Sequence, residues 1–474
     1  MQPQENHSST SRASNSSGAD AGGPIGRVIV CEQTHEVTCQ DGYKIYGIVF
    51  IPLERKDSTL SRVHSGGSET AILMAPAMGV PCRFYKDFCT FICESTGCMV
   101  ATLDYRGCFA SGLRVNAVQN DRSDSAKDNS KIMKDEKEIL FDIQNKYISV
   151  RNWGRFDVPA IMNFLESTPL HQLLLTTNFQ SKLPKIVNII NPSTETKELL
   201  NTQLTQFLTS LKQSPPIYPI HNFLYIAHSI GGQILAYFPS LYLQKFIGSV
   251  WVGTQSGLIA HWPWILPRIL MFFYWYVYLP SMAWMYPLNT PPVNVAKKLV
   301  RDWYSAGRCR RNYIFEYFGI EEPQKNGEHP AWTLEKIPMV SYVIEGDHFA
   351  PLQAATWILR SLSDPKFVSF TDQQHLNTDR SRIPKKIDVT LKKTDSTQPH
   401  DQPLTPNEKR MYHVHGEVAK KVGHFNFYKQ QEGRDECWPH MLTIVKQMLE
   451  LSHKENKQDS DMVEFPSHKR FSKL

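Results

Sequence analysis

The sequence contains no Cys-x-x-Cys pair and no Cys/His group with the spacing of a zinc site. Nine cysteines are present, an odd number, and five of them lie between Cys82 and Cys108 in apolar sequence. This usage indicates a reduced intracellular chain in which the thiols have a structural role. We therefore expect neither a metal nor a cofactor.

A strong excess of one charge is also missing. The chain has 52 basic and 46 acidic residues, a net charge of +6. The excess is spread out and by itself argues neither for nor against a nucleic-acid partner. The length of 474 residues suggests several domains. Because many stretches are too polar to fold, one large domain with insertions is the better expectation.

Polar segments interrupt the chain. Residues 1–23 are rich in Ser, Asn and Gly and have no apolar core, so we expect a disordered tail and no secretory signal. Residues 120–136 and 373–405 read as disordered insertions, and 167–219 as an elaboration between a helix and a strand. Residues 453–474 form a second polar tail. No internal repeat is visible.

Apolar runs alternate with helical patterns elsewhere. Asp41-Gly42 between two β-rich runs, 27–32 and 43–52, predicts a hairpin. Short continuous apolar runs then predict strands covered on both faces, and their alternation with helices indicates a mostly parallel α/β sheet flanked by helices. The expected strands are 71–75, 98–103, 222–227, 246–252, 339–345 and 366–370; the expected helices are 84–95, 157–166 with Asp157 as N-cap, 233–238 and 438–451.

A serine lies at the junction of one such strand and helix, in Ala227-His228-Ser229-Ile230-Gly231. This is the context of a nucleophile elbow, whose usual form is Gly-x-Ser-x-Gly. Gly231 meets the demand for small residues around the sharp turn, and Ala227 departs from it by one methyl group. The serine oxygen would lie at a helix N-terminus, where partial positive charge favours an anion. The alternative is a chance turn, but the flanking elements favour the elbow.

A serine nucleophile needs a base, and His424 follows Gly423 late in the chain, before the last expected helix. Asp347, just after the strand 339–345, is the candidate acid that would orient the imidazole. The order Ser, Asp, His is that of α/β-hydrolases. The rival acid is Glu345, which we expect to lie within the strand. The rival histidines are His413 and His415, at the edge of a polar insertion, and His440, in a helix.

The turn after the strand 71–75 supplies the last component. In Ala75-Pro76-Ala77-Met78-Gly79, the Met78 amide is a candidate oxyanion-hole donor, paired with the amide of Ile230. Read alone, this stretch is an ordinary turn. It gains weight only from its place after an early strand.

These blocks together resemble the predicted α/β-hydrolases related to the serine aminopeptidase and monoglyceride-lipase-like group. The other matching blocks are Phe84-Tyr85, Leu103-Asp104-Tyr105-Arg106-Gly107, Trp153-Gly154 with Asp157, and Gly423-His424-Phe425. The resemblance implies a hydrolase fold with a lid and assigns the triad to Ser229, Asp347 and His424. Phe109 departs from the pattern, because a glycine is usual there, and this puts the shape of that loop in doubt.

An aromatic segment, 262–286, is long enough to suggest a membrane span, but prolines and Arg268 interrupt it. We interpret it as part of a helical lid over 255–335 that lines an apolar pocket. Shallow membrane contact through this surface stays open. Residues 293–311 read as a basic amphipathic helix with Lys297, Lys298 and Arg301 on one side.

The sequence thus predicts a cytoplasmic serine hydrolase over 24–452 that cleaves an ester, with a lipid-like ester as one candidate, through an acyl-enzyme. A thioesterase or acyltransferase with the same triad is an alternative. So are a non-catalytic scaffold on this fold and a peripheral membrane protein anchored by the aromatic segment. The expected partner is a small-molecule ester or lipid substrate, with no nucleic acid and no obligate protein partner.

Overall fold

The structure is a computed structural model. It describes residues 29–53, 70–113, 129–168, 220–258, 261–262, 269–270, 272–285, 289–290, 295–307, 334–363, 386–387, 403–414, 416–429 and 431–462. The elaboration expected at 167–219 and the strand expected at 366–370 lie almost wholly outside these residues.

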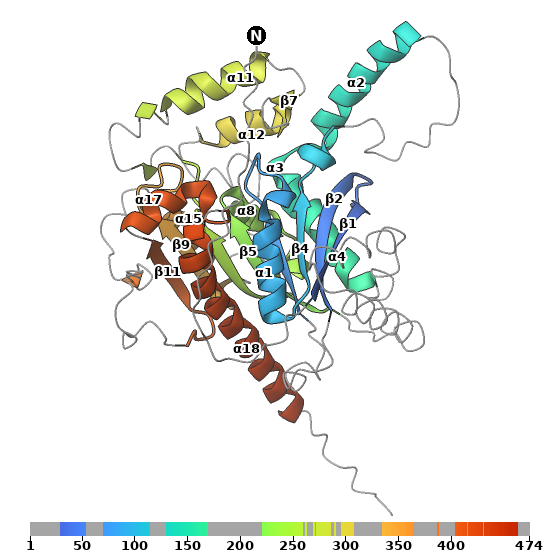
Figure 1. The fold of residues 1–474 in the computed structure, drawn as a ribbon. Helices are drawn as coiled ribbons and strands as arrows, with labels where there is room; N and C mark the ends of the chain where they lie inside the picture. Colours follow the sequence, from blue (N-terminus) through green and yellow to red (C-terminus); the bar gives the residue numbers. More distant parts are fainter. Residues whose placement is uncertain are drawn as a thin grey trace, which may run out of the picture.

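A nine-stranded sheet forms the centre of the described structure (Figure 1). Its strand order is β1-β2-β4-β3-β5-β6-β9-β11-β10. Within this sheet β2 alone runs opposite to the other strands. The strands are β1 (Ile29–Thr38), β2 (Lys44–Leu53), β3 (Thr70–Ala75), β4 (Val100–Asp104), β5 (Asn222–His228), β6 (Phe246–Val252), β9 (Met339–Ile344), β10 (Lys386–Ile387) and β11 (Lys409–Val414).

Helices cover both faces of this sheet, and α1 and α18 lie in front of it in Figure 1. They share one hydrophobic cluster with α17, whereas α4, η6, α12 and α15 pack into the cluster on the other face. The elements are η2 (Cys82–Tyr85), α1 (Lys86–Thr96), η3 (Phe109–Ser111), α2 (Asn129–Tyr147), α3 (Val150–Asn152), η5 (Trp153–Asp157), α4 (Val158–Ser167), α8 (Ile230–Gln233), η6 (Ile234–Tyr237), α9 (Ser240–Leu243), α12 (Lys297–Gly307), α15 (Leu352–Ser363), α17 (Gly416–Asn426), η12 (Gly433–Cys437) and α18 (Trp438–Met462).

The continuous apolar runs form strands because both of their faces are covered. In β3, Leu73 belongs to the cluster under α4, while its neighbours Ile72 and Met74 belong to the cluster under α1 and α18. Successive side chains of a strand point to opposite faces, so every position of such a strand must be apolar. The mostly parallel sheet, the flanking helices and the strand-to-helix turn after β5 confirm the expected α/β-hydrolase fold.

Two segments differ from the sequence-based expectation. β11 was not foreseen, because its polar residues resemble the insertion beside it, yet it pairs in parallel with β9 inside the sheet. The two residues of β10 lie within 373–405, where an insertion was expected. α2 begins at Asn129 and therefore overlaps the end of the stretch 120–136.

The expectation that Asp157 caps a helix is wrong. Asp157 has helical backbone angles, makes no capping hydrogen bond, and is fully buried. Its carboxylate accepts hydrogen bonds from Arg106 N (2.9 Å) and Arg106 Nε (2.5 Å), and from the Cys39 thiol (3.6 Å). Arg106 is itself completely buried and also bonds Asp41. A buried guanidinium requires carboxylate partners, and this requirement fixes Asp157.

Further helices are inserted between β6 and β9: η8 (Tyr274–Tyr278), α11 (Leu279–Met285) and α12, with the short strands β7 (Asn289–Thr290) and β8 (Val295–Ala296). They attach to the sheet region through the Ala296 amide, which donates to Gly107 O at 2.8 Å. Figure 1 shows α11 and α12 stacked beyond the carboxyl ends of the parallel strands, on the side where α8 follows β5. None of the helices among the described residues has the length and apolar character needed to cross a membrane.

Candidate active site

Ser229 occupies the turn between β5 and α8. Its backbone angles, φ 52° and ψ −117°, lie in a region that residues other than glycine rarely adopt. The turn is held by two hydrogen bonds, from Ser229 N to Val252 O (2.9 Å) and from Gly232 N to Ser229 O (3.2 Å). The residue is half-buried. The backbone is therefore strained, with the serine side chain still partly accessible.

Close packing around this turn explains its small residues. A Cβ on Gly231 would lie 2.6 Å from the carbonyl oxygen of Ala75, at the end of β3. A Cβ on Gly232 would lie 2.5 Å from the side chain of Thr254. Ala227, the departure from the usual pattern, pairs with Ala75 in the β3–β5 register and is fully buried. The turns after β3 and β5 are thus in direct contact.

Asp347 and His424 are joined by a buried hydrogen bond between Asp347 Oδ2 and His424 Nδ1, 2.7 Å long. The other carboxylate oxygen, Oδ1, accepts the amides of Phe349 (2.8 Å) and Ala350 (3.2 Å). Three donors therefore fix the carboxylate in the loop that follows β9. An acceptor at Nδ1 places the ring proton there and leaves Nε2 as the basic nitrogen.

His424 lies near the end of α17, where the helix is broken at Gly423. That glycine has φ 49° and ψ −162°, so it turns the chain and redirects the next residue. The imidazole packs against the rings of Phe349 and Phe425, with centroids 5.3 and 4.8 Å away. A Cβ on Gly253, the residue after β6, would come within 3.0 Å of the ring.

Ser229 and His424 both lie beside the end of β6. The Ser229 amide bonds Val252, and the next residue, Gly253, touches the His424 imidazole. The structure gives no hydrogen bond between the Ser229 hydroxyl and the His424 ring. Such bonds are often long in the absence of substrate and shorten in the reacting complex.

The rival residues occupy other places. His413 is buried within β11, and His440, in α18, bonds the Tyr342 hydroxyl at 2.7 Å. His415 lies outside the described residues. Glu345 is exposed and accepts the amide of Gly416 at 3.0 Å. None of the three described rivals contacts Asp347 or Ser229 through a hydrogen bond given by the structure.

The predicted oxyanion donors lie on the two touching turns. Among the described residues, neither the Met78 amide nor the Ile230 amide has a hydrogen-bond acceptor. The neighbouring Ala77 amide, in contrast, donates to the Tyr85 hydroxyl at 2.9 Å. Phe109, which replaces an expected glycine, adopts φ 42°. The loop therefore keeps the left-handed conformation in spite of the substitution.

Sequence reasoning names Tyr85 and His228 within its motifs without giving them a role, and it does not single out Ser256 or His261. Tyr85 and His228 are completely buried beside the turns, and burial lowers the pKa of His228 well below its usual range. Ser256 and His261 form a second Ser–His pair, with Oγ 2.6 Å from Nδ1. Burial lowers the pKa of His261 to about 4. No signal in the sequence distinguishes these residues from core positions.

The second pair lacks the features of the first. Ser256 is completely buried, and its hydroxyl also accepts the amide of Leu258 at 3.3 Å. The other ring nitrogen of His261 has no hydrogen-bond partner within the described part of the chain, so no carboxylate orients this ring. We interpret the Ser256–His261 pair as a structural contact at the start of the inserted segment.

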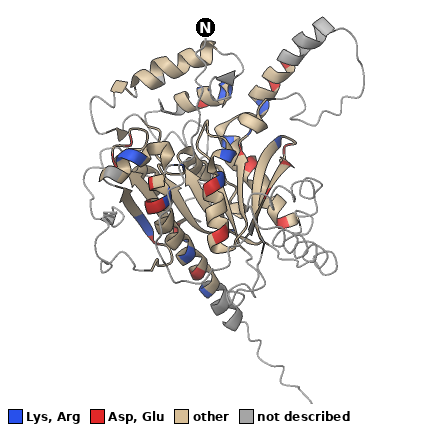
Figure 2. Cartoon of the chain, viewed as in Figure 1, with Lys and Arg blue, Asp and Glu red and all other residues tan. Residues whose placement is uncertain are grey.

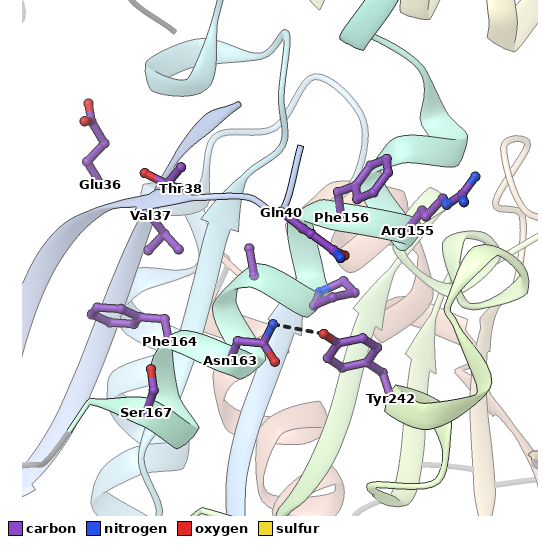
Figure 3. Close-up of a pocket in the computed structure, with 12 residues that line it drawn as sticks. Glu36, Val37, Thr38, Gln40, Arg155, Phe156, Asn163, Phe164, Ser167 and Tyr242 are labelled. Atoms are coloured by element: carbon purple, nitrogen blue, oxygen red, sulfur yellow. Dashed lines mark hydrogen bonds between the residues drawn. The ribbon is translucent and has the colours of Figure 1, made fainter. Parts of the chain in front are cut away.

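A hollow of about 570 Å³ lies elsewhere, between β1, η5, α4 and α9. Figure 3 shows Phe156, Asn163 and Phe164 beside it, with Asn163 Nδ2 donating to the Tyr242 hydroxyl (2.9 Å). Ser229, Asp347 and His424 do not line this hollow. Among the residues that the structure describes, no group of three or more His, Cys, Asp or Glu side chains has the arrangement of a metal site.

Comparison with known proteins gave structural likenesses alone. No protein-family model and no curated protein sequence matches the chain. Brefeldin A esterase, a bacterial homologue of human hormone-sensitive lipase, is similar over 92% of this chain and 81% of its own, at 10% identity and a TM-score of 0.37. Carboxyl esterase 2 of the fungus Tuber melanosporum is similar over 92% of this chain and 89% of its own, at 10% identity and a TM-score of 0.33. A putative aryl esterase from Burkholderia cenocepacia is similar over 88% of this chain and 100% of its own, at 12% identity and a TM-score of 0.35. These scores are too low to carry an argument, and the fold assignment rests on the sheet topology.

Proposed function

We propose that the protein is a serine hydrolase that cleaves a carboxylic ester, with Ser229 as nucleophile, His424 as base and Asp347 as orienting acid. The observation that carries the proposal is the buried bond between Asp347 Oδ2 and His424 Nδ1, beside a serine with strained backbone angles. Structural ion pairs are common, but they rarely coincide with a strained serine between a parallel strand and a helix.

The mechanism follows from these positions. Ser229 Oγ attacks the ester carbonyl carbon while His424 Nε2 takes the hydroxyl proton, and Asp347 stabilises the resulting imidazolium. The amides of Met78 and Ile230 donate to the oxyanion of the tetrahedral intermediate. When the intermediate collapses, the alcohol leaves with the proton from His424. Water, activated by the same nitrogen, then releases the acid from the acyl-enzyme.

An apolar acyl group is the favoured substrate feature. The inserted segment reaches the loop of the acid, because Trp262 Nε1 donates to His348 O at 2.7 Å. Trp262 and Leu258 are buried, and α11 and α12 continue the segment as a lid. Aromatic and apolar residues beside the acid suit a lipid-like ester better than a charged one. This feature also supports the proposed kinship with monoglyceride-lipase-like hydrolases.

The outer face of the lid favours shallow membrane contact, which we propose as a property of the same enzyme. Residues 269–285 contain no charged side chain, and Figure 2 shows α11 without a basic or acidic residue. Nine large apolar side chains between residues 269 and 285 are exposed, which is more than isolated surface positions. They are Ile269, Leu270, Phe272, Phe273, Tyr276, Val277, Tyr278, Trp284 and Met285.

Hydrolysis of p-nitrophenyl esters of increasing chain length tests the proposal. We expect turnover by the wild-type protein and its loss in Ser229→Ala. Ser256→Ala is the matched control, because it removes the hydroxyl of the other Ser–His pair and should retain activity. A preference that rises with chain length supports the lipid-like substrate. Equal activity in Ser229→Ala and wild type contradicts the proposed nucleophile.

A further inference from the structure

Three hydrogen bonds connect the turn after β3 with the backbone of His424. The Ala77 amide donates to the Tyr85 hydroxyl (2.9 Å), and this hydroxyl is 2.7 Å from His228 Nδ1. The other ring nitrogen, His228 Nε2, is 2.8 Å from His424 O. Tyr85 and His228 are completely buried, so water does not compete for these bonds.

The donor and the acceptor of each hydrogen bond in this chain of three bonds can be assigned. A carbonyl oxygen only accepts, so His228 Nε2 must carry a hydrogen and donate to His424 O. In a neutral imidazole the other nitrogen, Nδ1, is then an acceptor, and the Tyr85 hydroxyl donates to it. The hydroxyl oxygen remains free to accept the Ala77 amide. Burial and the nearby His424 hold the pKa of His228 well below its usual range, which keeps the ring neutral.

The chain of three hydrogen bonds reaches the proposed oxyanion turn, nucleophile and base, each through a neighbouring residue or through the backbone. Ala77 precedes Met78, a proposed oxyanion donor, and His228 precedes Ser229. The third contact is to the backbone of His424, whose ring is the proposed base. β3, β5 and α17 come from distant parts of the sequence. Among the contacts of the described residues, these three hydrogen bonds are the ones that link all three elements through side chains.

Aromatic rings hold the two side chains in place. Tyr428 packs edge-on against Tyr85, with centroids 5.0 Å apart, and its ring lies 5.1 Å from that of His228. Phe425 contacts the His228 ring at 5.8 Å. The Tyr428 hydroxyl is buried and has no hydrogen-bond partner among the described residues. It therefore belongs to the same cluster without belonging to the chain of bonds.

We propose that Tyr85 and His228 are positioning residues, which fix the oxyanion turn and the catalytic histidine relative to each other. This inference rests on the proposed serine-hydrolase function. The His228 ring packs against that of His424, with centroids 5.1 Å apart, and neither Tyr85 nor His228 makes a hydrogen bond to Ser229 Oγ or His424 Nε2 that the structure gives. Loss of either bond to the ring should let one element shift, and displacements of about 1 Å in such sites reduce turnover by up to about 100-fold.

The first test compares Tyr85→Phe with Tyr428→Phe, two deletions of one buried hydroxyl from the same cluster. The measurements are the rate of labelling by a fluorophosphonate probe, and kcat and KM for p-nitrophenyl butyrate. We expect Tyr85→Phe to lower the labelling rate and kcat by about 10- to 100-fold with KM nearly unchanged, because the oxyanion turn acts in the transition state. Tyr428→Phe should match wild type. Equal rates in the two variants overturn the proposal.

The second test uses two variants of His228 that each keep one bond. His228→Gln keeps a donor near the Nε2 position, and His228→Asn keeps an acceptor near the Nδ1 position. Each variant breaks the connection between the oxyanion turn and His424 at one end. Tyr85→Phe should therefore lower kcat by less than about threefold further in either background. A full additional loss in both backgrounds contradicts a linked chain of hydrogen bonds.

The outcomes separate the two proposals. If the wild-type protein shows no labelling that depends on Ser229, the proposed function fails and the positioning role fails with it. If wild type is labelled and Tyr85→Phe is labelled equally fast, the positioning role alone fails. The comparison of Tyr85→Phe with Tyr428→Phe decides the matter even if the His228 variants do not fold.

Discussion

Gly253 lies against the imidazole of His424, so closely that a Cβ at Gly253 would come within 3.0 Å of both Cε1 and Nδ1 of the ring. Gly253 also has φ +59°, and its amide donates to Tyr342 O at 3.0 Å. The position thus requires glycine for two separate reasons. One is the backbone conformation, and the other is the space occupied by the proposed base.

Substitution at this position should separate the two requirements. Gly253→Ala should lower kcat by about 100-fold, because the methyl group displaces the imidazole from Ser229. Gly416→Ala is the control, since Gly416 has φ +61° and a methyl group added there would meet nothing within 4 Å. Both variants should lose about 1 kcal/mol of stability from backbone strain. Kinetics and denaturant unfolding measure the two effects, and equal activity in both variants would show that Gly253 does not accommodate the base.

The acid should be essential for turnover and not for folding. Asp347→Asn puts an amide group opposite His424 Nδ1, and this group can donate as well as accept. The tautomer of the imidazole is then no longer fixed, and kcat should fall by about 10⁴-fold. Glu345→Gln changes the rival carboxylate two residues away and should leave kcat within about twofold. Steady-state assays on p-nitrophenyl butyrate give both numbers. A larger loss in Glu345→Gln than in Asp347→Asn would exchange their roles.

The buried His261 should make the protein sensitive to acid. Burial lowers the pKa of His261 to about 4, below its value in the unfolded chain, so the unfolded state binds more protons between these two pKa values. Stability is therefore complete above about pH 6.5 and falls as the pH drops toward 4, by about 2 kcal/mol at pH 5. His261→Asn should lose less stability than wild type between pH 7.5 and pH 5 in urea unfolding. An identical loss in both proteins would refute the assignment.

The exposed apolar residues of 269–285, on the outer face of the proposed lid, should bind neutral lipid. Replacing two of its exposed residues, Phe273 and Trp284, by serine should reduce flotation with phosphatidylcholine vesicles. Leu241→Ser is the control, because Leu241 is also well exposed but lies on α9, away from the lid. Flotation that is absent in wild type, or unchanged in the double variant, would rule out membrane contact through this face.

The buried ion pair should matter for folding. Asp157→Ala leaves the completely buried Arg106 with Asp41 as its remaining carboxylate and should destabilise the protein by about 3–5 kcal/mol. Cys39→Ala removes the weak thiol contact to Asp157 together with a small part of the core packing, and it should cost much less. Denaturant unfolding compares the two. Similar small losses would mean that Asp41 alone satisfies the guanidinium.

The strands that are covered on both faces could be located from the sequence, because a continuous apolar run of that length is typical of a buried strand. β6 was predicted with its observed bounds, and β3 and β5 to within one residue at each end. β11 was missed because Lys409, Arg410 and His413 make it look like the insertion beside it. Lys409 finds its partner through a tertiary contact, because its Nζ donates to Leu334 O (2.9 Å), and Arg410 pairs with Glu408, two residues before it.

The site was partly predictable for a similar reason. Ser229, Asp347 and His424 follow local patterns that end strands or break a helix, so their order in the chain was informative. Tyr85, His228 and Gly253 follow no such pattern. Their contacts join residues far apart in the sequence, for example Tyr85 with His228, and only the folded chain brings these partners together. Asp157 was misread for the same reason, since a cap and a buried counter-ion look alike in sequence.

Covalent labelling at a single residue decides whether Ser229 is the nucleophile. The folded protein is treated with a fluorophosphonate probe, and the adduct is located by mass spectrometry of its peptides. The proposed triad predicts one adduct on Ser229, its loss in Ser229→Ala, and strong slowing in His424→Ala. An adduct on Ser256 or on any other residue, or no adduct on folded wild-type protein, would contradict it.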